Sequence, residues 1–251
     1  MGARHALVTG GSGGIGAAIA RGLSRAGVAV TVLGRNTARL GAIVAAGDAA
    51  FQVEADVTDE AAVASAIAAA EARLGALAIL VNGAGAAESA PFARTTRSIW
   101  DRMIALNLTA TFTVTQAVLP GMLARDVGRV INIASTAGLT GYPYVAAYVA
   151  AKHGVIGLTR ALARETARSG VTVNAVCPGY TETELLMQSM AKVAQRTGRT
   201  AAEVRASFAA ANPQRRLVAP EEVAAAVLFL CGPDSGAMTG QAIAVAGGEV
   251  M

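Results

Sequence analysis

The chain has 251 residues, of which 53% are hydrophobic and 15% charged, and its formal net charge is +4. This composition is too apolar for a disordered chain, and the modest charge, spread along the sequence, does not indicate nucleic-acid binding. No apolar run reaches the roughly 18 residues of a membrane span, and the N-terminus shows neither a signal-peptide nor a myristoylation pattern. The two cysteines, Cys177 and Cys231, lack metal-ligand spacing. We therefore expect a reduced, cytoplasmic protein without a metal, folded as one domain over 1–251.

The first expected unit is a strand, a glycine-rich turn and a helix. Residues 5–9 read as a buried strand, residues 10–16 (GGSGGIG) as the turn, and an alanine-rich helix follows to about residue 26. In this order the glycines let the backbone approach a pyrophosphate, whose charge the helix N-terminus stabilises. We therefore predict a dinucleotide site. Its members here are Gly10, Ser12, Gly14, Ile15 and Gly16.

The end of the second strand, expected at 28–33, distinguishes between the two nicotinamide cofactors. An acidic residue there binds the ribose hydroxyls of NAD, whereas an arginine accommodates the 2′-phosphate of NADP. No carboxylate stands at this strand end, and Arg35 follows it directly. The sequence thus favours NADP(H), with NAD(H) as the alternative.

Strands and helices alternate over the rest of the chain. Helices are expected at about 37–46, 59–73, 98–125, 146–169, 183–211 and 220–231, and strands at about 50–55, 77–81, 127–134, 171–177 and 241–246. The alternation predicts a doubly wound, seven-stranded parallel sheet of Rossmann type with helices on both faces. Glycine-bearing turns after several strands favour ligand binding at one edge of this sheet. The segment 184–212, rich in Met, Gln and Arg, is predicted to be a mobile substrate flap.

Tyr148 and Lys152 lie four residues apart, a spacing that places two side chains on one face of a helix. A cation beside a phenol lowers its pKa from the usual value of about 10, so the tyrosine could exchange a proton near neutral pH. The fifth strand delivers Ser135, whose hydroxyl would hydrogen-bond the same oxygen. The Tyr-x-x-x-Lys spacing also occurs by chance on helix surfaces, so the other motifs must decide between a catalytic and a surface pair.

Over essentially its whole length the chain resembles the short-chain dehydrogenases/reductases, in their compact single-domain branch. The resemblance rests on a set of motifs in one order: Thr9-Gly10-x-x-x-Gly14-Ile15-Gly16, Asp56-Val57, Asn82-Gly83-Ala84-Gly85, Asn107, Ser135, Tyr148-x-x-x-Lys152, Asn174, Pro178-Gly179 and Thr183. Within that family, 131–138, 150–165 and 171–183 look most like bacterial ketoreductases that act on 3-oxoacyl thioesters or polyketides. One departure is Gly83, where many members carry Asn, Ala or Ser; since glycine is also small, we expect little consequence.

The resemblance implies a role for each motif. Tyr148 would be the general acid for carbonyl reduction and the base for the reverse reaction. Lys152 would lower the tyrosine pKa and bind the nicotinamide ribose, Ser135 would position the carbonyl, and Asn107 would hold a proton-relay water. Further cofactor contacts would come from Asp56, Val57, Asn82, Gly83, Ala84, Pro178, Gly179 and Thr183. A homotetramer is also implied, with interfaces on the helices that carry Asn107 and Tyr148, and on helix 220–231 with the last strand.

The loop 139–145 and the flap are expected to line the substrate side. The substrate residues would be Leu139, Tyr142, Tyr144, Val145 and Tyr180. Their aromatic and aliphatic character suits an apolar ketone or acyl chain, and we expect no fixed carboxylate there. Four basic flap residues could bind the phosphates of CoA or a carrier protein, although a solvated helix face explains them equally well. These are Lys192, Arg196, Arg199 and Arg205.

Three functions compete for this chain. The first is an NADPH-dependent ketoreductase, and the second is an NAD-dependent hydroxyacyl-CoA or secondary-alcohol dehydrogenase. The third is a non-catalytic dinucleotide-sensing regulator, which would be expected to have lost Tyr148 or Lys152; both are present.

Overall fold

Seven parallel strands form one sheet in the computed structural model, which describes residues 4–251. The strand order is β3-β2-β1-β4-β5-β6-β7, so the connection reverses direction between β1 and β4, where a doubly wound sheet forms its binding crevice. The predicted sheet is confirmed. The strands are β1 (His5–Thr9), β2 (Ala29–Gly34), β3 (Phe51–Glu54), β4 (Leu77–Asn82), β5 (Gly128–Ile133), β6 (Val171–Pro178) and β7 (Ala242–Val245). The predictions about a signal peptide and a myristoylation pattern involve residues 1–3, which lie outside the described residues.

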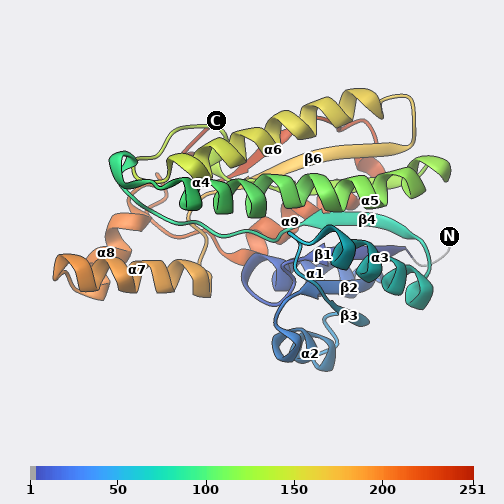
Figure 1. The fold of residues 1–251 in the computed structure, drawn as a ribbon, viewed down its shortest axis with the longest axis horizontal. Coiled ribbons are helices and arrows are strands. Elements are labelled where there is room, and N and C mark those ends of the chain that lie inside the picture. The colour runs from blue at the N-terminus through green and yellow to red at the C-terminus, as the bar shows by residue number, and fades with distance from the viewer. Residues whose placement is uncertain (1–3) are drawn as a thin grey trace.

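Helices cover both faces of the sheet (Figure 1). One face carries α1 (Gly14–Arg25), α2 (Thr37–Ala45) and α9 (Pro220–Cys231), and the other carries α3 (Glu60–Leu74), α5 (Ala110–Ala124) and α6 (Ala146–Glu165). The helix α4 (Arg97–Ile104) continues into α5 through a π-helical turn, η2 (Ala105–Thr109). Two further helices, α7 (Glu184–Thr197) and α8 (Ala201–Ala209), project from the body at the left of Figure 1. Short 3-10 turns occur at Phe92–Arg94, Thr136–Gly138 and Pro233–Ser235.

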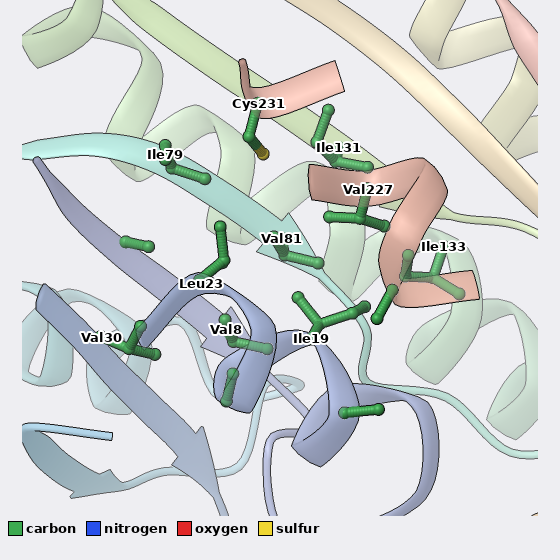
Figure 2. Close-up of a cluster of buried hydrophobic side chains, with 14 of the residues drawn as sticks. Val8, Ile19, Leu23, Val30, Ile79, Val81, Ile131, Ile133, Val227 and Cys231 are labelled. Carbon is green, nitrogen blue, oxygen red and sulfur yellow. The ribbon is translucent and has the colours of Figure 1, made fainter. Parts of the chain in front are cut away.

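Alternate residues of each strand enter opposite layers of the core. In β1, Val8 faces α1 and α9, whereas Leu7 faces α3 and α5. Figure 2 shows the first layer, in which Ile19 and Leu23 of α1 lie in one cluster with Val227 of α9. Burying each such side chain contributes about 1.5–3 kcal/mol, so the two layers hold the sheet and its helices in a fixed register. The carboxyl ends of the strands are thereby brought to one edge.

The continuous helix Arg97–Ala124 is long and apolar enough, by length and composition, to cross a membrane. The sequence predicts no such span, since polar residues such as Asn107 and Gln116 keep its apolar runs short. In the fold, Val114, Val118 and Met122 of α5 are buried against the sheet and α3. A helix packed in this way carries its apolar residues as part of the core.

Two local features differ from the elements expected from the sequence. The predicted single helix over 183–211 is two helices, because Gly198 ends α7 in a left-handed conformation (φ 69°) that glycine adopts without a Cβ clash. Thr200 then starts α8 with a capping box that uses Glu203. The second feature is the π-helical turn around Asn107, which hydrophobic periodicity does not reveal because it adds one residue to a turn.

Candidate functional site

The glycine-rich turn leads from β1 into a helix whose first amides are not capped by a side chain. Gly13 is the N-cap of α1, and within the described part of the chain no side chain caps it and no acidic residue stands in its first turn. Asn, Asp or Thr side chains cap α2, α3, α4, α7 and α8 instead. A Cβ on Gly16 would overlap the carbonyl oxygen of Gly10, so the tight turn requires glycine. The uncapped amides and the positive end of the helix dipole fit an anion such as a pyrophosphate.

Thr9 holds the turn that follows β4. Its hydroxyl accepts hydrogen bonds from the amides of Gly83 (3.0 Å) and Ala84 (3.1 Å). A Cβ on Gly83 would lie 2.7 Å from the Thr9 carbonyl oxygen, closer than real Cβ atoms come. A larger residue at position 83 would therefore clash with the backbone of Thr9. The sequence-based expectation that the identity of this residue has little consequence is not met. The role of Thr9 was missed as well, although the residue stands in the first motif.

Asn82 uses its side-chain amide inside the protein. Its Nδ2 donates to Thr115 Oγ1 and Asn132 Oδ1, both at 2.9 Å, and Asn132 donates in turn to Thr159 Oγ1 at 2.9 Å. This buried network ties β4 and β5 to α5 and α6. The sequence assigns Asn82 to the cofactor, whereas the structure places its amide in support of the strand ends beneath the turn.

Two other residues that are predicted to contact the cofactor pack their side chains on the core. Val57 is buried in the layer beneath α3 and α5. Ile15 is partly buried against the layer formed by α1 and α9. Their side chains therefore shape the adjoining turns by packing.

Ser135, Tyr148 and Lys152 come together where β5 ends and α6 begins. Lys152 Nζ lies 5.6 Å from the centroid of the Tyr148 ring and donates to the Ile133 carbonyl oxygen at 2.8 Å. Ser135 Oγ accepts from the Ala137 amide at 3.1 Å and also interacts with the Tyr148 hydroxyl. Ser135, which lies thirteen residues before Tyr148, thus joins the two helix residues in one group.

Burial sets the acid–base behaviour of this group. It raises the pKa of Tyr148, which the Ser135 hydroxyl lowers by a smaller amount, and it lowers the pKa of Lys152 to about 8. The sequence predicts instead that Lys152 lowers the tyrosine pKa. The structure differs because burial of the Tyr148 phenol is the largest effect on its pKa. In this arrangement the phenol holds its proton.

Asn107 reaches the same group from η2. Its Nδ2 donates to the carbonyl oxygens of Ala86 (2.9 Å) and Met103 (3.1 Å), and its Oδ1 accepts from the Ala86 amide (3.3 Å). A Cβ on Gly85 would lie 2.8 Å from Asn107 Oδ1 and 3.6 Å from Lys152 Nζ. Gly85 was not among the predicted site residues, yet it stands between two of them. Its place in the Asn-Gly-Ala-Gly turn was the available signal.

Arg35 and Asp56 lie together beyond the ends of β2 and β3. Arg35 Nη1 is 3.5 Å from Asp56 Oδ2, and the two side chains are 75% and 39% exposed. The amide and hydroxyl of Thr58 donate to the Asp56 carboxylate (2.9 and 2.7 Å) and lower its pKa. Ser12 Oγ lies 3.8 Å from the Cβ position of Gly34, beside Arg35. An exposed guanidinium and a hydroxyl therefore stand at the place where a 2′-phosphate is expected.

Thr183 links the glycine-rich turn to the flap. It caps α7 by accepting from the Leu186 amide (3.3 Å), and its methyl carbon lies 3.0 Å from the Cβ position of Gly14. Arg39 of α2 also donates two hydrogen bonds to Glu184, at 2.7 and 2.9 Å. The base of the flap is thus held against α1 and α2. Pro178 ends β6, and the amide of the next residue, Gly179, donates to Val245 of the last strand (3.1 Å).

The predicted substrate residues of the loop after β5 do not all face one space. Leu139 packs on a core cluster between α6 and β6, and Val145 is the N-cap residue of α6. Tyr144 is 64% exposed and has a positive φ of 68°, which is uncommon for a bulky residue. These three residues therefore shape the loop in different ways.

Tyr142 and Tyr180 belong to an aromatic cluster that includes a carboxylate. Tyr180 is edge-on to Tyr142 (centroids 6.3 Å apart) and to Phe208 of α8 (4.8 Å). The Tyr142 hydroxyl donates to Glu249. The expectation of no fixed carboxylate on this side is wrong, because Glu249 is brought there from the far end of the sequence.

The basic residues of the flap have separate environments. Arg205 pairs with Glu182 (2.8 Å), and Arg199 donates to the Glu203 carbonyl oxygen (2.9 Å). Lys192 and Arg196 are exposed on α7. Among residues 4–251, no group of three or more His, Cys, Asp or Glu side chains is arranged to hold a metal ion.

Comparisons with known proteins agree with this geometry. A family model described as short chain dehydrogenase matches residues 4–194. A relative from Streptomyces virginiae, named for a ketoacyl reductase of the monensin polyketide synthase, is 41% identical over 251 residues, which is 98% of this chain and 96% of that protein. The D-beta-hydroxybutyrate dehydrogenase of Rhizobium meliloti is 37% identical over 253 residues, 98% of either chain.

A solved structure extends the likeness from sequence to fold. It is a single-residue variant of actinorhodin polyketide ketoreductase with NADPH, which matches with a TM-score of 0.95 at 38% identity. The match covers 98% of this chain and 97% of that chain. The family match over most of the chain and the full-length relatives lead to one assignment. The chain belongs to the short-chain dehydrogenase/reductase family of oxidoreductases.

Proposed function

We propose that the protein is an NADPH-dependent ketoreductase that acts on a 3-oxoacyl thioester or a related polyketide-type ketone. The observation that carries the proposal is the meeting of Ser135, Tyr148 and Lys152 beside Asn107. The ketoreductases among its relatives support the same reaction class. The reaction converts a carbonyl to a secondary alcohol, which requires one hydride and one proton.

The residues of this chain would manage the proton. A nicotinamide cofactor, when bound, supplies the hydride to the carbonyl carbon. The Tyr148 hydroxyl gives its proton to the carbonyl oxygen, and the Ser135 hydroxyl donates a hydrogen bond to the same oxygen. Burial raises the pKa of Tyr148, which keeps the proton on the phenol and suits the reductive direction. Lys152, whose pKa is lowered to about 8, can pass a proton on near neutral pH, with Asn107 beside it.

The cofactor side fits a dinucleotide with an extra phosphate. The uncapped first turn of α1 would hold the pyrophosphate, and Asp56 would accept a hydrogen bond from the adenine. Arg35 and Ser12 would bind the 2′-phosphate. Measuring kcat/KM with both coenzymes tests this: at least a tenfold preference for NADPH is expected. A preference for NADH would favour the NAD-dependent hydroxyacyl-CoA or alcohol dehydrogenase instead.

The remaining proposals concern the whole protein. We propose one domain over 1–251, with 184–212 as a mobile flap, because α7 and α8 contribute to a small hydrophobic cluster separate from the two main core layers. A homotetramer is proposed because α5 and α9 expose apolar residues such as Phe112 and Phe229. A cytoplasmic location is proposed because both cysteines are free and buried.

Replacing Tyr148 with Phe tests the proposed mechanism. Loss of the general acid should lower kcat by about 10²- to 10⁴-fold, while NADPH binding, followed by nucleotide fluorescence, stays unchanged. The substrates would be acyl-thioester mimics and simple aryl ketones. The control is Ser65→Ala, which removes an exposed hydroxyl from α3 and should leave kcat within twofold. An unchanged rate in Tyr148→Phe would contradict the mechanism. Consumption of NADPH with none of these ketones would instead favour the regulator.

A further inference from the structure

The segment after β7 is built to return a side chain to the substrate side. Gly247 and Gly248 have positive φ values of 60° and 90°, which glycine adopts freely. A Cβ on Gly247 would overlap the amide of Asn212, and one on Gly248 would lie 3.6 Å from Pro213. The turn therefore packs closely on the end of the flap segment. This packing directs Glu249 back toward the ends of β5 and β6.

Glu249 is held between the loops that follow those two strands. One carboxylate oxygen accepts from the Tyr142 hydroxyl, which also hydrogen-bonds Thr136 Oγ1 at 2.9 Å. The other oxygen lies 2.8 Å from the Cβ position of Gly179, so a larger residue at 179 would displace it. Burial, and after it the hydrogen bond to Glu249, raises the pKa of Tyr142 well above its usual value. The phenol thus remains a donor, and the carboxylate is fixed in place.

Tyr180 connects this carboxylate to the proposed proton donor. The Tyr142 hydroxyl that donates to Glu249 also bonds Thr136, the residue that follows Ser135. Burial raises the pKa values of Tyr148 and Tyr180, with smaller contributions from Tyr180 to the first and from Glu249 to the second. The edge-on contact with Tyr142 places Tyr180 in the same cluster as Glu249. A negative charge therefore stands one tyrosine away from the position of the reacting carbonyl.

We infer that Glu249 is a specificity-determining residue that admits ketones with uncharged substituents and excludes 3-oxo acids with a free carboxylate. The inference rests on the proposed function and narrows its substrate class. A second carboxylate in this half-buried space would be repelled by Glu249 and would lose water as well. An ester, a thioester or a hydroxyl group meets only a hydrogen-bond acceptor. Specificity is then achieved by repelling the wrong substrate.

The test compares acetoacetate with its ethyl ester, a pair that differs in one charge. In Glu249→Gln, the ratio of kcat/KM for acetoacetate to kcat/KM for the ester should rise at least tenfold, mainly through a lower KM for acetoacetate. Glu60→Gln, which removes the same charge from the first turn of α3, is the control and should change neither value. An unchanged ratio between the two substrates in Glu249→Gln would overturn the inference.

Two further measurements separate this inference from the proposed function. Calorimetric titration of both compounds into the NADPH complex measures binding without turnover. If neither ketone is reduced, the proposed function fails. The inference is then judged by binding alone: acetoacetate should bind at least tenfold more tightly to Glu249→Gln than to the wild type. Equal binding to the two proteins would overturn it. Tyr142→Phe keeps the carboxylate and should continue to exclude acetoacetate; admission of acetoacetate by this variant would overturn the role of the charge.

Discussion

At the residue scale, Gly85 and Asn107 lie so close together that an added side-chain atom on residue 85 would not fit between them. Asn107 is held on two sides by the carbonyl oxygens of Ala86 and Met103, so its amide has little freedom to retreat. The space between Asn107 and Lys152 exists because residue 85 has no side chain. A displacement of Asn107 or Lys152 would therefore disturb the proposed proton path directly.

Replacing Gly85 with Ala should therefore lower activity without unfolding the protein. The new Cβ would stand 2.8 Å from Asn107 Oδ1, and a shift of about 1 Å in a catalytic group can cost about 10²-fold in rate. We expect kcat to fall between about 10- and 100-fold, with NADPH affinity unchanged. In the control Gly41→Ala on α2, the Cβ meets Gln52 at an ordinary 3.5 Å, and helix propensity should add about 0.5–1 kcal/mol of stability. Equal kcat values for both variants would contradict the prediction.

Lys152 predicts a pH dependence of stability with a definite sign. Its pKa in the fold, about 8, lies below the usual 10.5. Between these values the unfolded chain binds more protons than the folded one, so the contribution of Lys152 to the free energy of unfolding rises with pH. Relative to Lys152→Met, the wild type should gain about 1 kcal/mol between pH 7 and pH 9, measured by urea denaturation at each pH. The buried cysteines, whose raised pKa values act in the opposite direction, are common to both proteins. A pH-independent difference would argue against a buried, titrating lysine.

At the scale of elements, the flap is joined to the body at both of its ends. Met190 and Val204 of the flap form a small cluster with Leu217, which lies beyond it, and Tyr180 and Phe208 pack beside them. The ion pair between Arg39 of α2 and Glu184 of α7 then joins the flap to a helix on the far side of the glycine-rich turn. The pair lowers the pKa of Glu184, which indicates that the charged form is favoured. The flap should thus open more readily when the pair is lost.

Glu184→Gln should make the flap more sensitive to trypsin, whose target residues lie on α7 and α8. Cleavage between 192 and 205 is expected to be two- to fivefold faster than in the wild type, since the opened flap exposes those bonds. High salt should speed cleavage of the wild type more than that of the variant because it screens exposed charges. Asp101→Asn, which breaks an exposed pair with Arg97 on α4, is the matched control. Identical cleavage rates for all three proteins would show that the ion pair does not hold the flap.

At the scale of the whole molecule, apolar side chains remain exposed on helices that flank the sheet. Phe112 is 45% and Leu123 41% exposed on α5, and Phe229 is 58% exposed on α9. Where such side chains adjoin one another, they form the kind of apolar patch that associates with other proteins. Both helices are among those that the family resemblance places at tetramer interfaces.

Phe112→Glu should therefore disrupt assembly. Sedimentation at micromolar concentration is expected to give about four chain masses for the wild type and a smaller species for the variant, because a charge would be buried at the interface. Phe92→Glu is the control, since Phe92 is 78% exposed on a 3-10 turn outside these helices. A wild-type monomer would disprove the tetramer, and a tetrameric Phe112→Glu would remove α5 from its interface.

Much of the fold was predictable because its signals are local. The strand His5–Thr9 and the helix Pro220–Cys231 have the predicted bounds, and most other elements begin and end within a few residues of expectation. Buried runs, glycine turns and capping residues act through neighbours in the chain, so a single sequence displays them. The Tyr148–Lys152 spacing is local in the same sense. The split of the flap at Gly198 and the π-helical turn at Asn107 were not foreseen, since each depends on one residue's conformation within a helical pattern.

The sequence by itself determined the family, the parallel sheet and the candidate residues Ser135, Tyr148 and Lys152. Only the tertiary structure decided their surroundings. It showed that burial raises the pKa of Tyr148. It placed Gly85 beside Asn107, and it brought Glu249 to Tyr142 across 107 positions of the chain. The physical reason is that pKa values, close contacts and charge repulsion depend on distance in space, whereas sequence patterns report only distance along the chain.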